Sequence, residues 1–445
     1  MRRWFGRLAA GLIMAGSVGC AAPAPITATC SDLDAAWGNW PAALDVLASL
    51  KEAGESCGVE SLDGKLYAAH FNYGISLESE GNLAEAVSEY LAAFNLNPQR
   101  DEALKALARL NALPAPTPAE CNSDALQNPY LAISDPDQAH LVRLDGMQLM
   151  VGSQPFMIRG VNYYPRHAPW NRFLTDANLD EVAQELDLIQ QAGFNTLRLF
   201  LWYEPLFTCQ PEAAVPNEES FVKLDAILNL AAARNLKVLM TLNDLPDLYF
   251  RPLYTDWAHY DAQTRYIVRR YRSNTTVLGW DVRNEGDIDY GENRVLERFT
   301  KEQVMGWLEH ITALVKENDP YHLITAGWLS DSAATAPFVD LVSFHHWSDP
   351  QSLSTRIDIY TGHGKPLLLE EVGYSTWTGG EQTQAQNLQA AIQTAESRGL
   401  GGWMIWTAFD FQPEPGQSEG IEHHFGLWTL DLTAKPAVQV VKGSN

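Results

Sequence analysis

From residue 158 onward the sequence alternates short apolar runs with helical patterns, and this alternation limits the possible fold more than any other feature. Short apolar runs bounded by turn residues are typical of buried parallel strands. The expected strands are Ile158–Tyr164, Thr196–Trp202, Lys237–Asn243, Leu278–Glu285, His322–Trp328, Asp340–His346, Pro366–Glu371 and Gly402–Thr407. Helical patterns lie between them, at Asn178–Ala192, Glu218–Arg234, Ala262–Arg272, Thr300–Lys316 and Gln382–Arg398. The alternation predicts an α/β fold, a (β/α)8 TIM barrel.

Two of the expected strands end in carboxylates. The run Val277–Asp287 delivers Glu285 at its tip, and the run Lys365–Gly373 delivers Glu370 and Glu371. In a (β/α)8 barrel the chemistry lies at the C-terminal ends of the strands. Two carboxylates there are what cleavage of a glycosidic bond requires, one as proton donor and the other as nucleophile or base. The sequence therefore predicts a glycoside hydrolase, with Glu285 and Glu371 as its catalytic pair.

The formal net charge of −24 limits the classes of partner. It argues against nucleic acid and against an anionic membrane surface, because both repel an acidic protein. A neutral carbohydrate is compatible with this charge, and several of the 14 tryptophans could offer flat apolar faces to sugar rings. The sequence has no C-x-x-C motif and no His/Cys cluster, so we predict neither a metal nor another cofactor.

The first 20 residues have the pattern of a signal peptide and are left out of the fold prediction. Arg2, Arg3 and Arg7 precede the apolar run Leu8–Val18. This run is too short to span a bilayer as a mature helix. Ser17–Cys20 resembles the lipobox of bacterial lipoproteins, whose cysteine becomes the lipidated N-terminus, although Ser17 stands where leucine is usual. We therefore expect a secreted or cell-surface protein, lipid-anchored at Cys20. Ordinary signal cleavage nearby is the alternative.

Four further cysteines make an even set, which predicts disulfides in an oxidising compartment. Pairing Cys30 with Cys57 and Cys121 with Cys209 is one of three possible connectivities and is favoured by proximity in the sequence. Free buried thiols are the alternative.

Residues 30–113 are rich in Ala and Leu at helical spacing and predict a small all-α domain. The segment Tyr67–Pro98 resembles a tetratricopeptide repeat. The residues at the offsets typical of that repeat are Gly74, Leu77, Ala86, Tyr90, Ala93 and Pro98. Such a domain could dock a protein partner, or it could be a helical spacer.

A proline-rich linker is expected at residues 114–135, followed by the barrel domain at 136–445. The barrel domain opens with the alternating pattern His140–Phe156, which predicts a hairpin that turns at Asp145-Gly146. We expect this hairpin to cover the bottom of the barrel.

Residues 140–435 resemble the cellulase-type family 5 of clan A glycoside hydrolases. Phe156–Tyr164 (F-M-I-R-G-V-N-Y-Y) matches the first strand of the clan, and the second strand carries Arg198 where the family has an active-site arginine. Residues 284–285 match the Asn-Glu pair that ends the fourth strand. The segment K-P-L-L-L-E-E-V-G around Glu371 matches the seventh strand.

The resemblance implies a retaining double displacement, with Glu371 as nucleophile and Glu285 as acid/base. It implies that Arg198 keeps Glu371 ionised, that Asn284 hydrogen-bonds the sugar 2-hydroxyl and that His345 orients one of the acids. The negative charge of Glu371 is expected to raise the pKa of Glu285. The further residues expected to contact substrate are Trp406, which would floor the glycone subsite, Trp202, Asn162, Asn243 and Trp347.

Three positions depart from the family pattern. Trp347 replaces a tyrosine whose hydroxyl touches the nucleophile, and Asn243-Asp244 stands where many members have histidine. Glu370 stands where a small residue is usual, and strand alternation predicts that its side chain points away from the site. Asp244 is expected to be a loop-forming acid.

These departures leave the sugar open. The substrate could be a β-linked glucan, a mannan or a related glycan, attacked internally or from an end, by hydrolysis or by transglycosylation. The alternative is a cell-surface carbohydrate-binding protein with a catalytically weak barrel and a helical domain that recruits a partner. The presence of both glutamates, Arg198 and Asn284 argues against that alternative, because a binding protein has no need of a catalytic pair.

Overall fold

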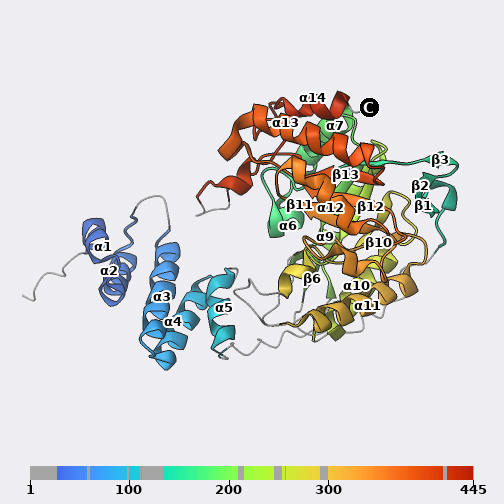
Figure 1. The fold of residues 1–445 in the computed structure, drawn as a ribbon. Helices are drawn as coiled ribbons and strands as arrows, with labels where there is room; N and C mark the ends of the chain where they lie inside the picture. The colour runs from blue at the N-terminus through green and yellow to red at the C-terminus, as the bar shows by residue number, and fades with distance from the viewer. Residues whose placement is uncertain are drawn as a thin grey trace, which may run out of the picture. The chain divides into compact units, whose positions relative to one another are not determined.

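The structure is a computed structural model that describes residues 28–57, 61–97, 100–110, 112, 134–208, 215–244, 253–255, 257–290, 299–413 and 418–443. The chain divides into two compact units, Met1–Pro114 and Ala115–Asn445 (Figure 1). Within the described ranges, no helix is both long and apolar enough to cross a membrane. The expected signal peptide with Cys20, most of the expected linker, and both Cys121 and Cys209 lie outside these ranges.

The N-terminal unit is helical in its described part. Its helices are α1 (Cys30–Ala36), α2 (Trp40–Ala53), α3 (Leu62–Ser79), α4 (Leu83–Leu96) and α5 (Asp101–Arg109). A disulfide joins Cys30 to Cys57, which confirms that predicted pairing and ties the start of α1 to the segment after α2. Helices α3 and α4 pack closely because Gly74 has no side chain. A Cβ atom there would meet the ring of Tyr90 at 2.5 Å.

The second unit is the predicted barrel. Its strands are β4 (Ile158–Asn162), β5 (Thr196–Phe200), β8 (Lys237–Thr241), β9 (Val277–Asp281), β10 (Leu323–Thr325), β11 (Val342–His346), β12 (Leu367–Val372) and β13 (Gly402–Ile405). They pair in parallel in the order β10-β9-β8-β5-β4-β13-β12-β11. A parallel bridge between Trp328 and Phe344 links the two ends of this order and closes the barrel.

Helices cover the outside of the barrel (Figure 1). They are α6 (Phe173–Asp176), α7 (Leu179–Gln191), α8 (Tyr203–Leu206), α9 (Glu218–Ala232), α10 (Trp257–Tyr271), α11 (Lys301–Asn318), α12 (Leu353–Tyr360), α13 (Thr376–Ser397) and α14 (Ala437–Gly443). Local sequence sets their starts. Asn178 accepts hydrogen bonds from the first backbone N–H groups of α7, and Thr300 with Gln303 forms a capping box on α11.

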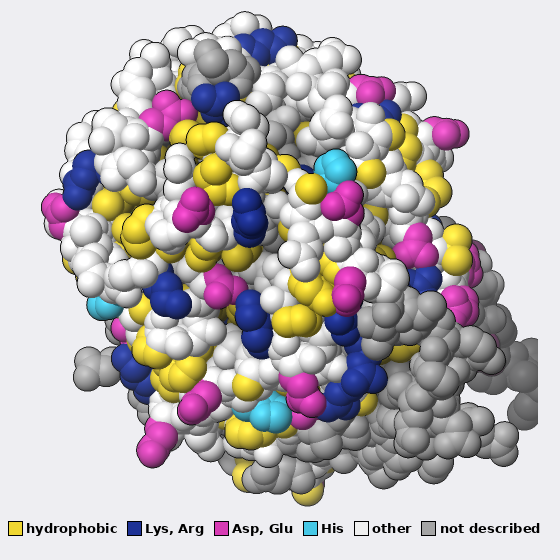
Figure 2. All heavy atoms as spheres, turned by 90° about the vertical axis from the view of Figure 1, so that its right-hand side faces the viewer, with side chains coloured by type: hydrophobic (Ala, Val, Ile, Leu, Met, Phe, Trp, Pro, Cys, Tyr) yellow, Lys and Arg dark blue, Asp and Glu magenta, His cyan; other side chains and the backbone are white. Residues whose placement is uncertain are grey.

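The predicted hairpin covers the bottom of the barrel. It consists of β1 (Val142–Asp145) and β2 (Gln148–Val151), followed by the short β3 (Gln154–Pro155). Val142 and Leu149 are buried in one apolar cluster with the first residues of the strands, such as Ile158 and Leu278. This packing confirms the prediction and leaves the opposite end of the barrel for the site. The side of the molecule that carries the hairpin faces the viewer in Figure 2, where acidic and basic side chains are interspersed.

Seven of the eight expected strands are longer than the observed ones, and two of them extend furthest beyond the observed C-terminal end. β9 ends at Asp281 and β10 at Thr325, although the sequence predicted strands up to Glu285 and Trp328. Glu285 lies in the left-handed region, with φ 48°, so the chain has already left the strand before it presents this acid. Val282 after β9 and Ala326 after β10 are apolar and buried, so composition alone does not mark where the ladder ends.

Candidate active site

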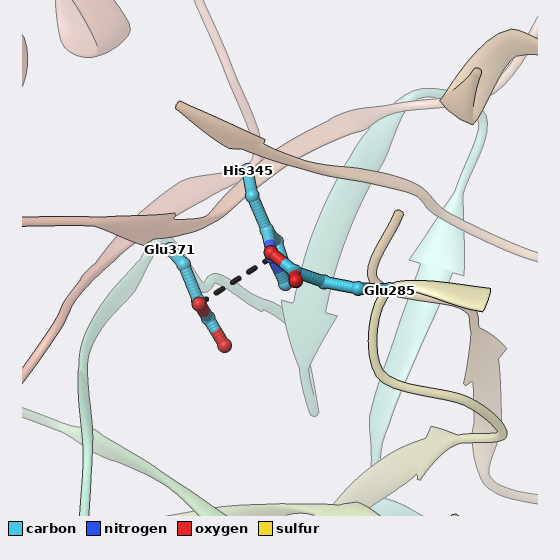
Figure 3. A group of neighbouring side chains, drawn as sticks. All are labelled: Glu285, His345 and Glu371. Carbon is cyan, nitrogen blue, oxygen red and sulfur yellow. Dashed lines mark hydrogen bonds and ion pairs between the residues drawn. The ribbon is translucent and has the colours of Figure 1, made fainter. Parts of the chain in front are cut away.

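Three ionisable side chains meet at the C-terminal end of the barrel. Glu285 follows β9, His345 lies on β11 and Glu371 lies on β12 (Figure 3). Nδ1 of His345 is 2.9 Å from Oε1 of Glu285 and 3.4 Å from Oε2 of Glu371. The facing carboxylate oxygens and the imidazole nitrogen all lie within 4.8 Å of one another. The two carboxyl groups that the sequence singled out thus face each other across one small gap.

Hydrogen bonds from Glu285 and from the neighbouring Arg283 fix the backbone around Glu285. Its N–H donates to the carbonyl of Gly327 at 2.7 Å. The buried guanidinium of Arg283 donates to the hydroxyl of Tyr254, to the carboxylate of Asp289 and to the backbone carbonyls of Asp244 and Asn284. A left-handed residue other than glycine costs free energy, and such a conformation persists where its surroundings determine it. These contacts supply that constraint and aim the carboxylate at the gap.

Arg198 on β5 is the cation beneath the site. It is fully buried, and its guanidinium donates to Glu371, to Asp281 at 2.6 Å and to Oδ1 of Asn284 at 3.0 Å. A carboxylate that receives a hydrogen bond from a buried guanidinium is stabilised in its ionised form. Arg198 therefore lies where it can hold Glu371 as an anion.

Asn284 is oriented by a buried residue whose role the sequence reasoning missed. Its Nδ2 donates to Oδ1 of Asp244 at 2.9 Å, and Oδ2 of Asp244 accepts from the hydroxyl of Tyr164 at 2.6 Å. The indole of Trp202 donates to that hydroxyl at 2.8 Å. Asp244 is 4% exposed, so it is a buried brace rather than a loop-forming acid. The available signal was its place directly after the third barrel strand.

The other residues expected to contact substrate fall into two groups. Trp406 and Trp347 lie at the site with their rings 6.4 Å apart, and Nε1 of Trp347 is 3.4 Å from Oε1 of Glu285. Trp347 thus contacts the expected acid/base, whereas the family's tyrosine would touch the nucleophile. Asn162 and Asn243 were expected to contact substrate, but both side chains are buried. Their amides are buried and donate to backbone carbonyls of neighbouring strands, which leaves them as structural braces below the site.

Glu370 corrects the prediction from strand alternation. The ladder between β11 and β12 shifts at this point, because Phe344 pairs with Leu369 and His345 pairs with Glu371. Glu370 is therefore the extra residue of a β-bulge, and its carboxylate is fully buried beneath the site, 3.6 Å from Nε2 of His345. A bulge breaks the regular alternation of side chains, so two consecutive glutamates lie on the inner side.

The pKa values of the three groups are coupled. Burial lowers the pKa of His345, but the charge of Glu371 and hydrogen bonding to Glu285 and Glu370 outweigh it and raise that pKa to about 10. Burial raises the pKa of Glu371 to about 7 against the opposing effect of His345 and Arg198. Burial also acts to raise the pKa of Glu285, yet the hydrogen bond and charge of His345 bring it below its ordinary value. The expected rise at Glu285 is absent because His345 carries the proton.

The same three groups could in principle face a metal ion, since each offers one ligand atom. The positive charge at the site already comes from the protein, however. Arg198 is bonded to Glu371, and the protonated imidazole of His345 donates to Glu285. This arrangement suits proton transfer and nucleophilic attack by carboxylates.

The chain is similar in sequence to two mannan endo-1,4-beta-mannosidases. The chain is 24% identical to mannan endo-1,4-beta-mannosidase 8 of Oryza sativa subsp. japonica over 50% of this chain and 62% of that protein. It is 23% identical to mannan endo-1,4-beta-mannosidase A of Emericella nidulans over 67% of this chain and 87% of that protein. The chain thus spans less than two thirds of the rice relative and most of the fungal one.

Solved structures share the fold. A GH5_18 protein from Streptomyces cattleya, in complex with Manb1-4GlcNAc, aligns with a TM-score of 0.57 and 22% identity over 64% of this chain and 79% of that one. The family model described as Cellulase (glycosyl hydrolase family 5) matches residues 153–412, which hold every site residue named above. The chain therefore belongs to glycoside hydrolase family 5, the cellulase family.

Proposed function

We propose that this glycoside hydrolase cleaves β-linked mannose-containing glycans with retention of configuration. The spacing of the two carboxylates is the observation that carries the proposal. Oxygens of Glu285 and Glu371 lie within 4.8 Å of one another. Retaining enzymes hold the carboxyl groups about 5–5.5 Å apart, whereas inverting enzymes need roughly 6.5–9.5 Å to admit a water molecule.

In the first step Glu371 attacks the anomeric carbon while Glu285 protonates the leaving oxygen. Arg198 supports the ionised state of the nucleophile through its direct hydrogen bond. In the second step Glu285, now a carboxylate, removes a proton from water, and the water displaces Glu371 from the sugar. Asn284 has one amide hydrogen left after it bonds Asp244, and this hydrogen is free to bind a sugar hydroxyl next to the reacting carbon.

The choice of mannose rests on the relatives. The two curated proteins compared above are both named mannan endo-1,4-beta-mannosidases, and the bacterial structure holds a disaccharide with a β-linked mannose. Trp406 and Trp347, whose rings meet edge to face at an interplanar angle of 76°, support the proposal from the chain itself, because aromatic faces bind the apolar faces of sugar rings.

The test is a substrate screen with the wild type and Glu371→Gln. We expect the wild type to release reducing sugar from β-mannan or from β-mannosides faster than from β-glucan or xylan, and the variant to be inactive. Product lengths over time separate internal cleavage from release of end units. If the wild type binds these glycans and hydrolyses none of them, the carbohydrate-binding alternative replaces this proposal.

We also propose that the protein is exported and lipid-anchored at Cys20. The lipobox-like sequence Ser17–Cys20 supports this localisation. The disulfide between Cys30 and Cys57 supports an oxidising compartment, since such bonds are rare in the cytosol. In a bacterial host, Cys20→Ala should move the protein from the membrane fraction to the soluble extracytoplasmic fraction. An unchanged distribution would refute the anchor.

A further inference from the structure

A third glutamate lies directly beneath the catalytic pair. The bulge in β12 turns Glu370 inward, and its side chain is completely buried. The space for its carboxylate exists because residue 327 is glycine. A Cβ atom at Gly327 would overlap Oε2 of Glu370, and it would lie 2.9 Å from Nε2 of His345 and 3.0 Å from Nη2 of Arg198. Glycine at position 327, just after β10, therefore provides the space that the carboxylate of Glu370 occupies.

Glu370 faces the two groups that hold the catalytic carboxylates. Its Oε2 is 3.6 Å from Nε2 of His345 and 3.7 Å from Nη2 of Arg198. His345 in turn donates through Nδ1 to Glu285, and Arg198 donates to Glu371. Among the described residues, neither Nε2 of His345 nor either carboxylate oxygen of Glu370 has a closer hydrogen-bond partner. Each is thus the available partner of the other.

We propose that Glu370 is a positioning residue that acts on Glu285 through His345, as the far end of a carboxylate–imidazole–carboxylate relay. This inference rests on the proposed function only in taking Glu285 as the acid/base. A carboxylate at Nε2 keeps a hydrogen on that nitrogen, so the proton that can leave the imidazolium is the one on Nδ1. A buried carboxylate fixes the tautomer of a catalytic histidine in the same way in serine proteases.

The relay moves one proton and changes no other bond. The Nδ1–H bond of the imidazolium breaks and an O–H bond forms on Oε1 of Glu285, 2.9 Å away. Glu285 becomes a neutral acid able to protonate the leaving oxygen. His345 becomes a neutral imidazole with its remaining hydrogen directed at Glu370. When Glu285 later takes a proton from water, the same path returns that proton to Nδ1.

The relay explains the resting state of the site. His345 holds the proton there and Glu285 is the carboxylate, the reverse of what the first catalytic step needs. The groups that set this balance face His345 and Glu370 from three strands. They are Arg198 on β5, Asp281 on β9, Glu371 beside the bulge on β12, and Glu285 after β9. Contacts in free enzymes are often long and shorten in the substrate complex, so 3.6 Å suits such a relay.

The test compares Glu370→Gln with the wild type on leaving groups of different acidity, using whichever β-glycoside the wild type cleaves. Poor leaving groups need the general acid, whereas a dinitrophenyl glycoside does not. We expect kcat/KM on the oligosaccharide to fall roughly 10- to 100-fold and on the dinitrophenyl glycoside less than about threefold. The alkaline limb of the pH profile should move to lower pH, because His345 loses the carboxylate hydrogen-bond acceptor at Nε2 that helps to raise its pKa. Glu185→Gln, at a buried acid of α7, is the matched control and should leave both readouts unchanged.

Two further measurements test the relay. Nitrogen-15 spectra of labelled histidine should show that His345 deprotonates at lower pH in Glu370→Gln, even if the wild type cleaves no glycoside tested. Gly327→Ala, whose Cβ atom would overlap Oε2 of Glu370, should also lower kcat/KM on the poor leaving group. Equal losses on both leaving groups in Glu370→Gln, or an unmoved titration of His345, would each overturn the relay.

Discussion

Replacing the buried nucleophile should stabilise the barrel, and increasingly so as pH rises. Burial raises the pKa of Glu371 from its ordinary value of 4.5 to about 7. A group whose folded pKa lies above its unfolded value contributes stability that is complete below the unfolded pKa. That contribution is lost as pH rises through the folded value, here between about 4.5 and 7. Glu371→Gln removes the ionisation and hence this loss.

The magnitude follows from the two pKa values. Between pH 5 and pH 8 the wild type should lose about 2.5 kcal/mol through this one group, at about 1.4 kcal/mol for each unit of pKa difference. The advantage of Glu371→Gln over the wild type should grow by that amount, which corresponds to roughly 5 °C in Tm for a domain of this size. His345 adds to the trend, because it loses the charge of Glu371 that helps to keep it protonated.

The assay is thermal and urea unfolding of both proteins at pH 5, 6, 7 and 8. Glu381→Gln, at an exposed position of α13, is the control for loss of a carboxylate and should show no such trend. A stability difference between Glu371→Gln and the wild type that stays constant over this range would refute the reasoning. It would mean that Glu371 is as readily ionised in the folded barrel as in the unfolded chain.

Three other substitutions test separate parts of the structure. Glu285→Ala should lower kcat/KM on a glycan by about 10²–10⁴-fold, and added azide should restore turnover of an activated aryl glycoside; no rescue would argue against Glu285 as the acid/base. Asp244→Ala leaves the amide of Asn284 without its partner and should lower kcat roughly tenfold, while an unchanged kcat would show that Asn284 is held otherwise. Replacing Cys30 and Cys57 by serine should destabilise the helical unit by roughly 3 kcal/mol in urea unfolding and leave kcat/KM unchanged.

The barrel strands could be predicted from the sequence because they are buried on both faces of the sheet. Parallel barrel strands are covered on both faces, so their sequences are nearly continuous apolar runs. β9 is entirely buried along Val277–Asp281, and β12 along Leu367–Val372. The predicted helices α7 and α11 carry an apolar face and a capping residue, which also depend only on neighbouring residues. Features of this kind are visible in one stretch of sequence.

The site itself was predictable only in part. Glu285 and Glu371 could be found because an acid at the end of an apolar run is unusual. The inward turn of Glu370 could not, because a bulge is defined by the pairing of β12 with its neighbours and not by its own residues. The role of Asp244 depends on Tyr164, 80 positions earlier, and on Asn284, 40 positions later. Contacts at that range appear in a single sequence only as unexplained polar residues.

The same long-range packing decides which groups are charged. Arg198 and His345 face four carboxylates, those of Asp281, Glu285, Glu370 and Glu371, and all of these groups except Glu285 are buried. Two cations cannot balance four anions there, and burying unbalanced charge is costly, so protons must be shared among these groups. A motif can name the nucleophile and the acid, but it cannot say where the shared proton rests. That position follows from the bulge at Glu370 and the missing side chain at Gly327, which together put a third acid behind the histidine.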